Sequence, residues 1–171
     1  MGRENQLVGA FGERTVEAEL LRRGWLTSNV NASIKNAADY DIIAVKKART
    51  IHLRIKTCGA GFKSFQFGGF RPGEEISVGT IPDSDYTVLV QMSTRRDDDS
   101  FWVVPTKVVR QQIRLHRLAY MKQPKRDGGL RKDIGHWTLH LDALQSGEDR
   151  PARGLREKWK SYLDNWSSLE G

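Results

Sequence analysis

The stretch DYDIIAVKKARTIHLRIKT, residues 39–57, contains two apolar segments separated by a short basic turn. Residues 42–45 are apolar without interruption, as in a strand that is buried on both faces. In residues 50–57 apolar and basic side chains alternate, and alternating side chains face opposite sides of a strand. The stretch therefore predicts a β-hairpin whose second strand has one apolar and one basic face. The apolar face would carry Ile51, Leu53 and Ile55, and the basic face would carry His52, Arg54 and Lys56.

A helix is predicted before the hairpin and further strands after it. Apolar residues recur at nearly helical spacing from about Gly2 to Arg23, and Gly24 stands where a helix would end. Residues 25–30 suit a short strand. Residues 58–82 are rich in glycine and indicate a loop with room for a short hairpin. Residues 85–92 and 100–105 then predict two more buried strands.

The second half of the chain predicts two helices and one strand. Residues 106–121 form a basic amphipathic pattern with Val108, Val109, Ile113 and Leu118 facing inward. Residues 136–141 alternate as in a strand, and residues 155–169 carry aromatic side chains at helical spacing. This order predicts one α/β domain over residues 1–171, with a mixed central β-sheet flanked by helices.

The composition favours a partner that is a polyanion. The chain has 171 residues, a formal net charge of +7 and a pI near 9.7, and basic side chains that neutralise phosphates release bound counterions. A basic surface kept only for solubility would give a similar composition. Cys58 is the single cysteine, so no disulfide can form within the chain. No apolar run reaches the roughly 18 residues that span a bilayer, and no secretory signal is visible, so we expect a cytoplasmic protein without membrane contact.

Several kinds of chemistry lack their sequence signature. The four histidines occur without the spacing of metal ligands, and no serine or cysteine lies in a nucleophile motif. The glycines match no loop that cradles phosphates, so a nucleotide cofactor is not expected.

Three short segments, GERTVEAELLRRGW, DYDIIAV and IHLRIKT, resemble in their order the PD-(D/E)XK nuclease superfamily, which includes restriction endonucleases and Holliday-junction resolvases. Members carry a glutamate in the first helix, an aspartate that opens a core strand, and an acid-x-lysine motif on the next strand. Glu13, Asp41 and Lys56 match these positions. The resemblance implies a restriction-endonuclease-like fold, with residues 1–121 as its core and residues 122–171 as a strand and C-terminal helix added to it.

The resemblance also implies a mechanism. Asp41 and Glu13 would hold Mg²⁺ or Mn²⁺, which polarises a phosphodiester and lowers the pKa of an attacking water. Lys56 would position that water or stabilise the charge that develops on the phosphate. For Glu13 and Asp41 ordinary structural roles are also open, whereas a lysine buried in a sheet is costly without a function or a partner.

Arg54 departs from the family pattern, because members have Glu, Asp or Gln two residues before the lysine. A guanidinium cannot bind a cation and stays protonated. In one interpretation Asp39, Glu17 or Glu13 supplies the missing carboxylate, and Arg54 contacts a phosphate. In the other, the site has lost its metal, and the domain only binds DNA.

Basic and aromatic residues outside this site are candidates for DNA contacts. Phe62, Phe65, Phe67 and Phe70 would stack on bases or cover the core. Trp159, Tyr162 and Trp166 suit core packing or the seam of a homodimer. The residues expected to contact phosphates are Arg54, Lys63, Arg71, Arg110 and Arg114.

Three functions follow from these observations. The first is a Mg²⁺-dependent DNA endonuclease, and the second is a non-catalytic DNA-binding module on the same fold. The third is a protein-interaction domain of a larger complex, with the aromatic residues as its contact surface.

Overall fold

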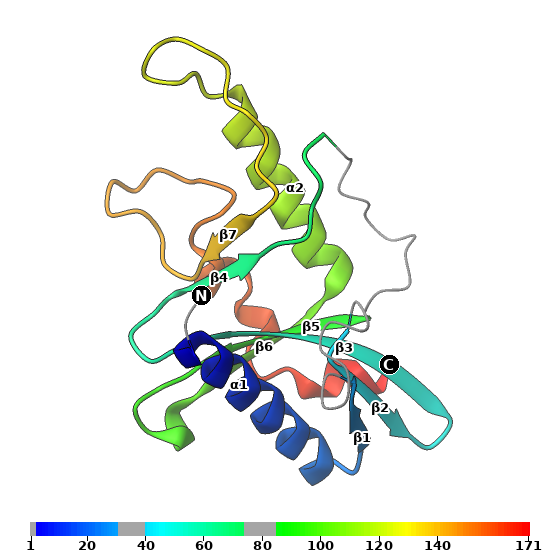
Figure 1. Cartoon of the computed structure of the whole chain (residues 1–171). Coiled ribbons are helices and arrows are strands. Elements are labelled where there is room, and N and C mark those ends of the chain that lie inside the picture. Colours follow the sequence, from blue (N-terminus) through cyan, green and yellow to red (C-terminus); the bar gives the residue numbers. More distant parts are fainter. Residues whose placement is uncertain (1–2, 31–39, 74–84) are drawn as a thin grey trace. The chain divides into compact units, whose positions relative to one another are not determined.

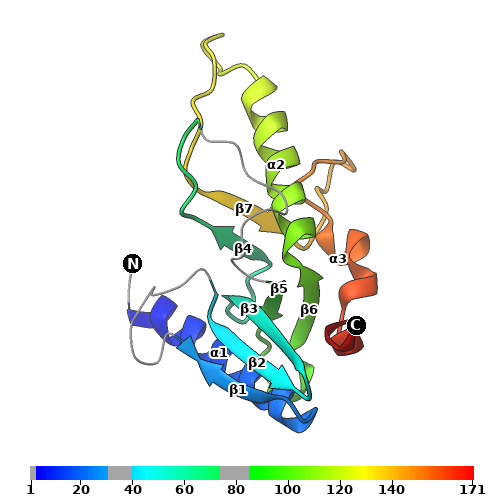
Figure 2. The same cartoon turned by 90° about the vertical axis from the view of Figure 1, so that its right-hand side faces the viewer.

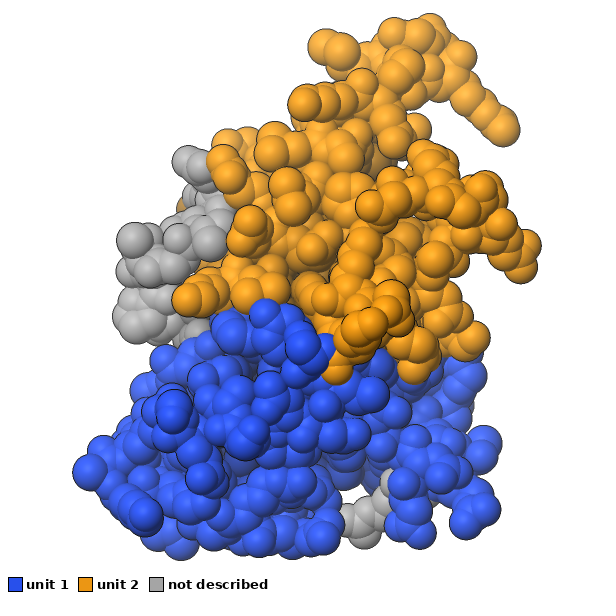
Figure 3. All heavy atoms as spheres, turned by 180° about the vertical axis from the view of Figure 1, so that it is seen from behind, with its two compact units in different colours: residues 1–62, 82–106, 161–171 blue, residues 63–81, 107–160 orange. Residues whose placement is uncertain are grey.

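The computed structural model describes residues 3–30, 40–73 and 85–171 (Figure 1). The expectations for residues 31–39 and 74–84, including Asp39 as a spare ligand, lie outside the described residues. The chain divides into two compact units (Figure 3). Unit 1 comprises residues 1–62, 82–106 and 161–171, and unit 2 comprises residues 63–81 and 107–160.

Unit 1 is built on a five-stranded sheet with the order β1-β2-β3-β5-β6. Strands β3 and β5 pair in parallel, and the other neighbours are antiparallel. The strands are β1 (Leu26–Asn29), β2 (Ile42–Lys46), β3 (Arg49–Cys58), β5 (Tyr86–Gln91) and β6 (Ser100–Pro105).

The predicted hairpin is confirmed. Strands β2 and β3 are antiparallel, with Ile42 opposite Leu53 and Lys46 opposite Arg49. Lys47 takes a positive φ of 55° in the tight turn between the strands. The side chains of β3 alternate between buried and half-buried from Ile51 to Lys56, so the apolar and basic faces of this strand lie where the alternation predicts.

Helix α1 (Arg3–Arg22) covers the apolar face of the sheet and contacts β1, β2 and β3 (Figure 2). Gly12 allows the helix to come close, because a Cβ at this position would lie 1.8 Å from Thr57 Oγ1. The core of unit 1 contains Val16, Leu20, Trp25, Ile42, Ala44, Ile51, Leu53, Ile55, Val88, Val90, Phe101, Val103, Trp166 and Leu169. The predicted mixed α/β class, with helices flanking a mixed sheet, is therefore confirmed.

The prediction of one continuous C-terminal helix over residues 155–169 is wrong. The segment contains α3 (Leu155–Lys158) and two 3-10 helices, η3 (Lys160–Tyr162) and η4 (Trp166–Glu170). Between the last two, Asp164 takes a positive φ of 49°, and its N–H donates to the carbonyl oxygen of Phe101 at 2.7 Å. In a helix this N–H would bond four residues back, so the contact with β6 replaces a helical hydrogen bond.

Unit 2 contains a two-stranded sheet and helix α2 (Thr106–Lys122), whose first residue belongs to unit 1. Strand β4 (Ser64–Phe67) lies in the glycine-rich segment and pairs antiparallel with β7 (Trp137–His140), so the described part of this segment, residues 58–73, contains a strand with a distant partner and no local hairpin. Phe65 and Phe67 are buried opposite Leu139 and Trp137. These two phenylalanines therefore pack in the protein, whereas Phe62 is exposed.

The buried face of α2 differs from the prediction at Leu118, and Val108, also predicted to face inward, is half-buried. Val109 and Ile113 are buried as expected, and His116 and Tyr120 continue this stripe and meet the ring of Trp137 edge-on. Leu118, which the pattern predicts to face inward, is 46% exposed. It lies five residues after Ile113, which places it well off the stripe of a helix with 3.6 residues per turn.

Candidate active site

Asp41 is held at the end of the β2–β3 hairpin by three hydrogen bonds. Its N–H donates to the Leu53 carbonyl oxygen at 2.8 Å, and its own carbonyl oxygen accepts from the Val30 N–H at 2.9 Å. Its carboxylate Oδ2 accepts from the N–H of Ile55 at 2.6 Å. The Asp41 carboxylate thus accepts a hydrogen bond from β3 at a point just before β2 begins.

Arg54 and Lys56 lie on the face of β3 opposite the apolar core, and both side chains are half-buried. Burial lowers the pKa of Lys56 below its ordinary value, the neighbouring Arg54 guanidinium lowers it further, and the Asp41 carboxylate raises it. Lys56 therefore interacts electrostatically with both residues, and the structure brings Asp41, Arg54 and Lys56 into one site.

Glu13 lies on α1, the helix that covers the apolar face of the sheet. Its Oε2 accepts from Asn29 Nδ2 at 2.9 Å, which ties the helix to the last residue of β1. Glu17, one turn further along the helix, forms an ion pair with Arg14 at 2.9 Å and accepts from the hydroxyl of Thr27. Glu17 therefore joins α1 to β1 and has the contacts of a structural acid.

The carboxylates of Asp41 and Glu13 are of the chemical type that binds a divalent cation together with a substrate. In the described parts of the chain, no group of three His, Cys, Asp or Glu residues could enclose a metal ion. However, Mg²⁺ is commonly held by one or two carboxylates together with waters and substrate phosphates. Asp41 and Glu13 are two carboxylates of this kind.

His52, His116 and His140 have structural contacts. His52 lies against the ring of Tyr40 and has its Nδ1 3.3 Å from a carboxylate oxygen of Asp85. Burial and the charge of Arg153 lower the pKa of both His116 and His140, and the second is lowered further by His116. A lowered pKa favours neutral rings in unit 2 near pH 7.

The five residues expected to contact phosphates are divided between the units. Arg54 lies in unit 1, whereas Lys63, Arg71, Arg110 and Arg114 lie in unit 2. Lys63 forms an ion pair with Asp142 at 2.8 Å, while Arg71 and Arg114 are exposed and Arg110 is half-buried. Sequence reasoning did not single out Lys107 and Lys122, although the helical period places both with Arg114 on the α2 face opposite Val109.

The positive charge of the chain is concentrated in unit 2. This unit has sixteen lysine and arginine residues and eight aspartate and glutamate residues, which give a formal charge of +8. Unit 1 has twelve basic and thirteen acidic residues, and hence a formal charge of −1.

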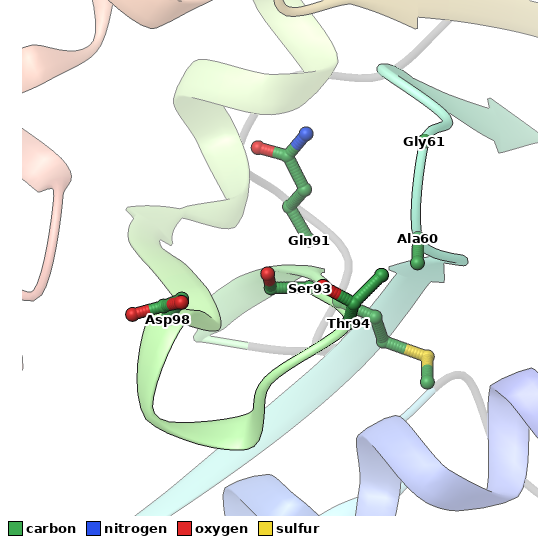
Figure 4. A pocket seen from close by; sticks show the side chains of 7 residues that line it. Ala60, Gly61, Gln91, Ser93, Thr94 and Asp98 are labelled. Atoms are coloured by element: carbon green, nitrogen blue, oxygen red, sulfur yellow. The ribbon is translucent and has the colours of Figure 1, made fainter.

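A separate polar pocket of about 260 Å³ lies in unit 1 (Figure 4). Asp98 is its one charged lining residue within the described chain, so the pocket offers no cation for a phosphate. It also contains none of Glu13, Asp41 and Lys56. Its lining residues are Ala60, Gly61, Gln91, Met92, Ser93, Thr94 and Asp98.

Comparison with known proteins shows that the fold of this chain is similar to that of a solved structure. No protein family matches the sequence, and no curated protein matches it. The structure of a bacterial homing endonuclease, I-Ssp6803I, matches with a TM-score of 0.53 and 12% sequence identity, and the match covers 96% of this chain and 91% of the other. The crystal structure of MepB gives a TM-score of 0.35 at 11% identity, over 86% and 95% of the two chains, which is too weak to support a conclusion. The fold is therefore similar to that of a nuclease. No helix in the described residues is long and apolar enough to cross a membrane.

Proposed function

We propose that this chain is a metal-dependent DNA endonuclease with a divergent PD-(D/E)XK site. The observation that carries the proposal is the placement of Asp41, whose carboxylate is fixed on the N–H of Ile55, next to Lys56 in the chain. A carboxylate and a half-buried lysine at the end of one hairpin are the groups that phosphodiester hydrolysis requires. The similarity to the fold of a homing endonuclease supports the same function.

Asp41 and Glu13 would hold Mg²⁺ or Mn²⁺, which supplies charge stabilisation at the phosphate and a more acidic water. Because its backbone is bonded to Val30, just after β1, and to Leu53 of β3, Asp41 keeps its carboxylate in one position. Lys56 has a lowered pKa, so its ammonium group gives up a proton more readily than that of an exposed lysine. It would orient the attacking water and neutralise charge on the phosphate oxygens.

Arg54 would bind the substrate phosphate. Its guanidinium is planar, carries five N–H donors and remains charged at working pH. It lies on the same face of β3 as Lys56, so one phosphate would be contacted by two cations. In this proposal the position that carries an acid in related nucleases has changed from holding the metal to holding the substrate.

Unit 2 would supply most of the affinity for DNA. Its charge of +8 is large for so small a unit, and phosphate contacts account for a large share of DNA affinity. Along α2, Lys107, Arg114 and Lys122 lie opposite the buried stripe of Val109 and Ile113, and the half-buried Arg110 lies at the side of this stripe. The basic residues of α2 that would contact DNA are Lys107, Arg110, Arg114 and Lys122.

The proposal is tested by incubating supercoiled plasmid and branched DNA with the full chain in Mg²⁺ or Mn²⁺. Asp41→Asn is the informative variant, because an amide oxygen can still accept from the N–H of Ile55 while the carboxylate charge is lost. Asp97→Ala, at an exposed acid in the turn before β6, is the matched control. We expect metal-dependent nicking by the wild type and the control, and none by Asp41→Asn.

The second candidate function is a DNA-binding module without catalysis, and the observation that favours it is Arg54. If the wild type binds DNA with steep salt dependence but cuts none of these substrates, this second function replaces the first. If the wild type does not bind DNA at any salt concentration, the function that remains is that of a protein-interaction domain. A homodimer is part of the nuclease proposal, because cutting both strands suits two sites, and light scattering of the purified chain measures it.

A further inference from the structure

Leu130 is the most exposed large apolar residue in the described parts of the chain, at 84% exposure. It lies in the connection between α2 and β7, and we call residues 123–132 of this connection the arm. Within unit 2 the arm projects beyond the C-terminal end of α2 (Figure 1, Figure 2). Single exposed leucines are common on protein surfaces, so the surroundings of Leu130 decide what it can do.

The arm around Leu130 is basic. Four of its ten residues are basic and one is acidic, so its formal charge is +3. The acid, Asp127, accepts the N–H of Gly129 at 2.9 Å and so belongs to the turn of the arm itself. The charge of the arm therefore favours a polyanionic partner. Its basic residues, on both sides of Leu130 in the chain, are Lys125, Arg126, Arg131 and Lys132.

A closed turn fixes the backbone just before Leu130. The N–H of Lys125 donates to the carbonyl oxygen of Gly129 at 2.8 Å, and the N–H of Gly128 donates to the carbonyl oxygen of Lys125 at 3.0 Å. Gly128 takes a positive φ of 78°, which glycine adopts without strain. The chain is therefore already turned where Leu130 begins.

Arg131 fixes the backbone just after Leu130. Its Nε donates to the carbonyl oxygen of Gln123 at 3.1 Å, and its guanidinium carbon lies 4.7 Å from the ring centroid of Tyr120. Tyr120 in turn meets the buried ring of Trp137 edge-on. Leu130 is thus exposed between two neighbours that are held in place, and a partner that buried it would order little further chain.

Building on the DNA binding in the proposed function, we infer that the arm enters the minor groove of duplex DNA and inserts Leu130 between two adjacent base pairs. Apolar side chains that act as wedges in this way unstack one base step and kink the duplex by about 20–90°. The basic residues on both sides of Leu130 would contact the phosphates that border the groove. One leucine fills one gap between base pairs, whereas it buries too little apolar area to hold a protein on a membrane.

The inference is tested with the full chain in Ca²⁺ on a duplex with 2-aminopurine at several A·T pairs and a donor and an acceptor dye at its two ends. Unstacking raises the fluorescence of 2-aminopurine, and a kink raises the energy transfer between the dyes. We expect the wild type to raise both signals and Leu130→Ala to lose both. Leu130→Ala should bind the duplex about threefold to tenfold more weakly, with an unchanged slope of log K against log salt, because no phosphate contact is removed.

Two further variants separate the wedge from the loss of any exposed leucine. Leu130→Met should keep both signals, because methionine also serves as a wedge. Leu26→Ala is the matched control, since Leu26 is 73% exposed, lies in unit 1 and has no basic neighbour in the chain. It should equal the wild type in both signals and in affinity.

Replacing Lys125 and Arg126 by glutamine tests the phosphate contacts of the arm. This variant should lower the slope of log K against log salt by about two, roughly one for each cation removed. An unchanged slope would overturn the placement of the arm in the groove.

The inference is overturned if Leu130→Ala bends and unstacks the duplex as the wild type does. It is also overturned if Leu130→Ala keeps its DNA affinity but no longer binds vesicles of anionic lipid, because Leu130 would then serve a membrane surface. If the wild type cuts DNA but gives neither signal, the inference fails and the nuclease stands. If the wild type gives both signals through Leu130 but cuts no DNA, the nuclease fails and the inference stands.

Discussion

The two compact units of this chain differ in charge and in the kind of residue that they place on their surfaces. Unit 1 is close to neutral at −1 and contains Glu13, Asp41 and Lys56, whereas unit 2 carries +8. A site that is to hold a divalent cation requires carboxylates, and a surface that is to follow a phosphate backbone requires cations. In the proposed nuclease, catalysis and DNA affinity would therefore reside in different units.

A loss of catalysis without loss of binding would sharpen this comparison most. Asp41→Asn should reduce cleavage about a thousandfold or more, because a metal ion supplies several kcal/mol of transition-state stabilisation. DNA affinity, measured by fluorescence anisotropy in Ca²⁺, should stay within a factor of about three, since the variant leaves the cations of unit 2 in place.

A comparable loss of affinity in Asp41→Asn would contradict the division into two roles. In that case the site in unit 1 would contribute to binding as much as the basic unit does.

The reverse change is to remove cations from unit 2. Replacing Lys107, Arg110 and Arg114 by glutamine should lower DNA affinity and reduce the slope of log K against log salt by about three, roughly one for each phosphate that is no longer neutralised. Affinity measured over a series of salt concentrations gives this slope. The control replaces Lys47 and Arg95, two exposed cations of unit 1, by glutamine and should leave the slope unchanged.

Equal losses of affinity from the two sets of substitutions would mean that net charge, and not the α2 face, attracts the DNA. A loss only in the control would place the binding surface on unit 1.

Compared with unit 2, unit 1 should also lose more stability when the packing between its helix and its sheet is changed. A Cβ at Gly12 would lie 1.8 Å from Thr57 Oγ1, so Gly12→Ala must push α1 away from β3. We expect Gly12→Ala to lower the free energy of unfolding by about 1–3 kcal/mol, as overpacking of a core does. Urea denaturation measures this change.

Gly9→Ala is the matched control on the same helix. No atom lies within 4 Å of the Cβ that it would add, and alanine has a higher helix propensity than glycine, so it should stabilise the protein by up to about 1 kcal/mol. Equal effects at both positions would show that the contact between Gly12 and Thr57 does not limit how closely the helix packs.

The hairpin could be predicted from the sequence because its signal is local. The alternation from Ile51 to Lys56 lies within a few residues, and the turn at Lys47 joins the two strands directly. Strand β4 is harder to predict, because its partner Trp137 is 70 residues away from Phe67 in the chain and a four-residue strand has little pattern of its own. The prediction of the C-terminal helix is wrong for a related reason, since the bond from Asp164 to Phe101 depends on a distant strand.

The candidate site, like the fold, could be predicted from the sequence only where its signal is local. Asp41 and Lys56 stand out because each adjoins an apolar strand, and the structure brings them together. The hydrogen bond from Asn29 to Glu13, sixteen residues earlier, has no such signal. Contacts of this kind depend on how α1 lies on β1, which a short motif does not record.

The smallest expected effect concerns the energetic cost of Lys56 itself. Lys56→Met should abolish cleavage yet raise the free energy of unfolding at pH 7 by on the order of 1 kcal/mol, as removal of a strained functional group often does. Because burial lowers the pKa of Lys56 from 10.5, the unfolded state binds more protons than the native state between the two pKa values. The stability of the wild type should therefore rise with pH in this window, and the advantage of the variant should shrink. Urea denaturation at pH 7 and pH 10 measures this difference in the free energy of unfolding. If the stability advantage of Lys56→Met does not change with pH, it comes from better packing and not from removal of the buried charge.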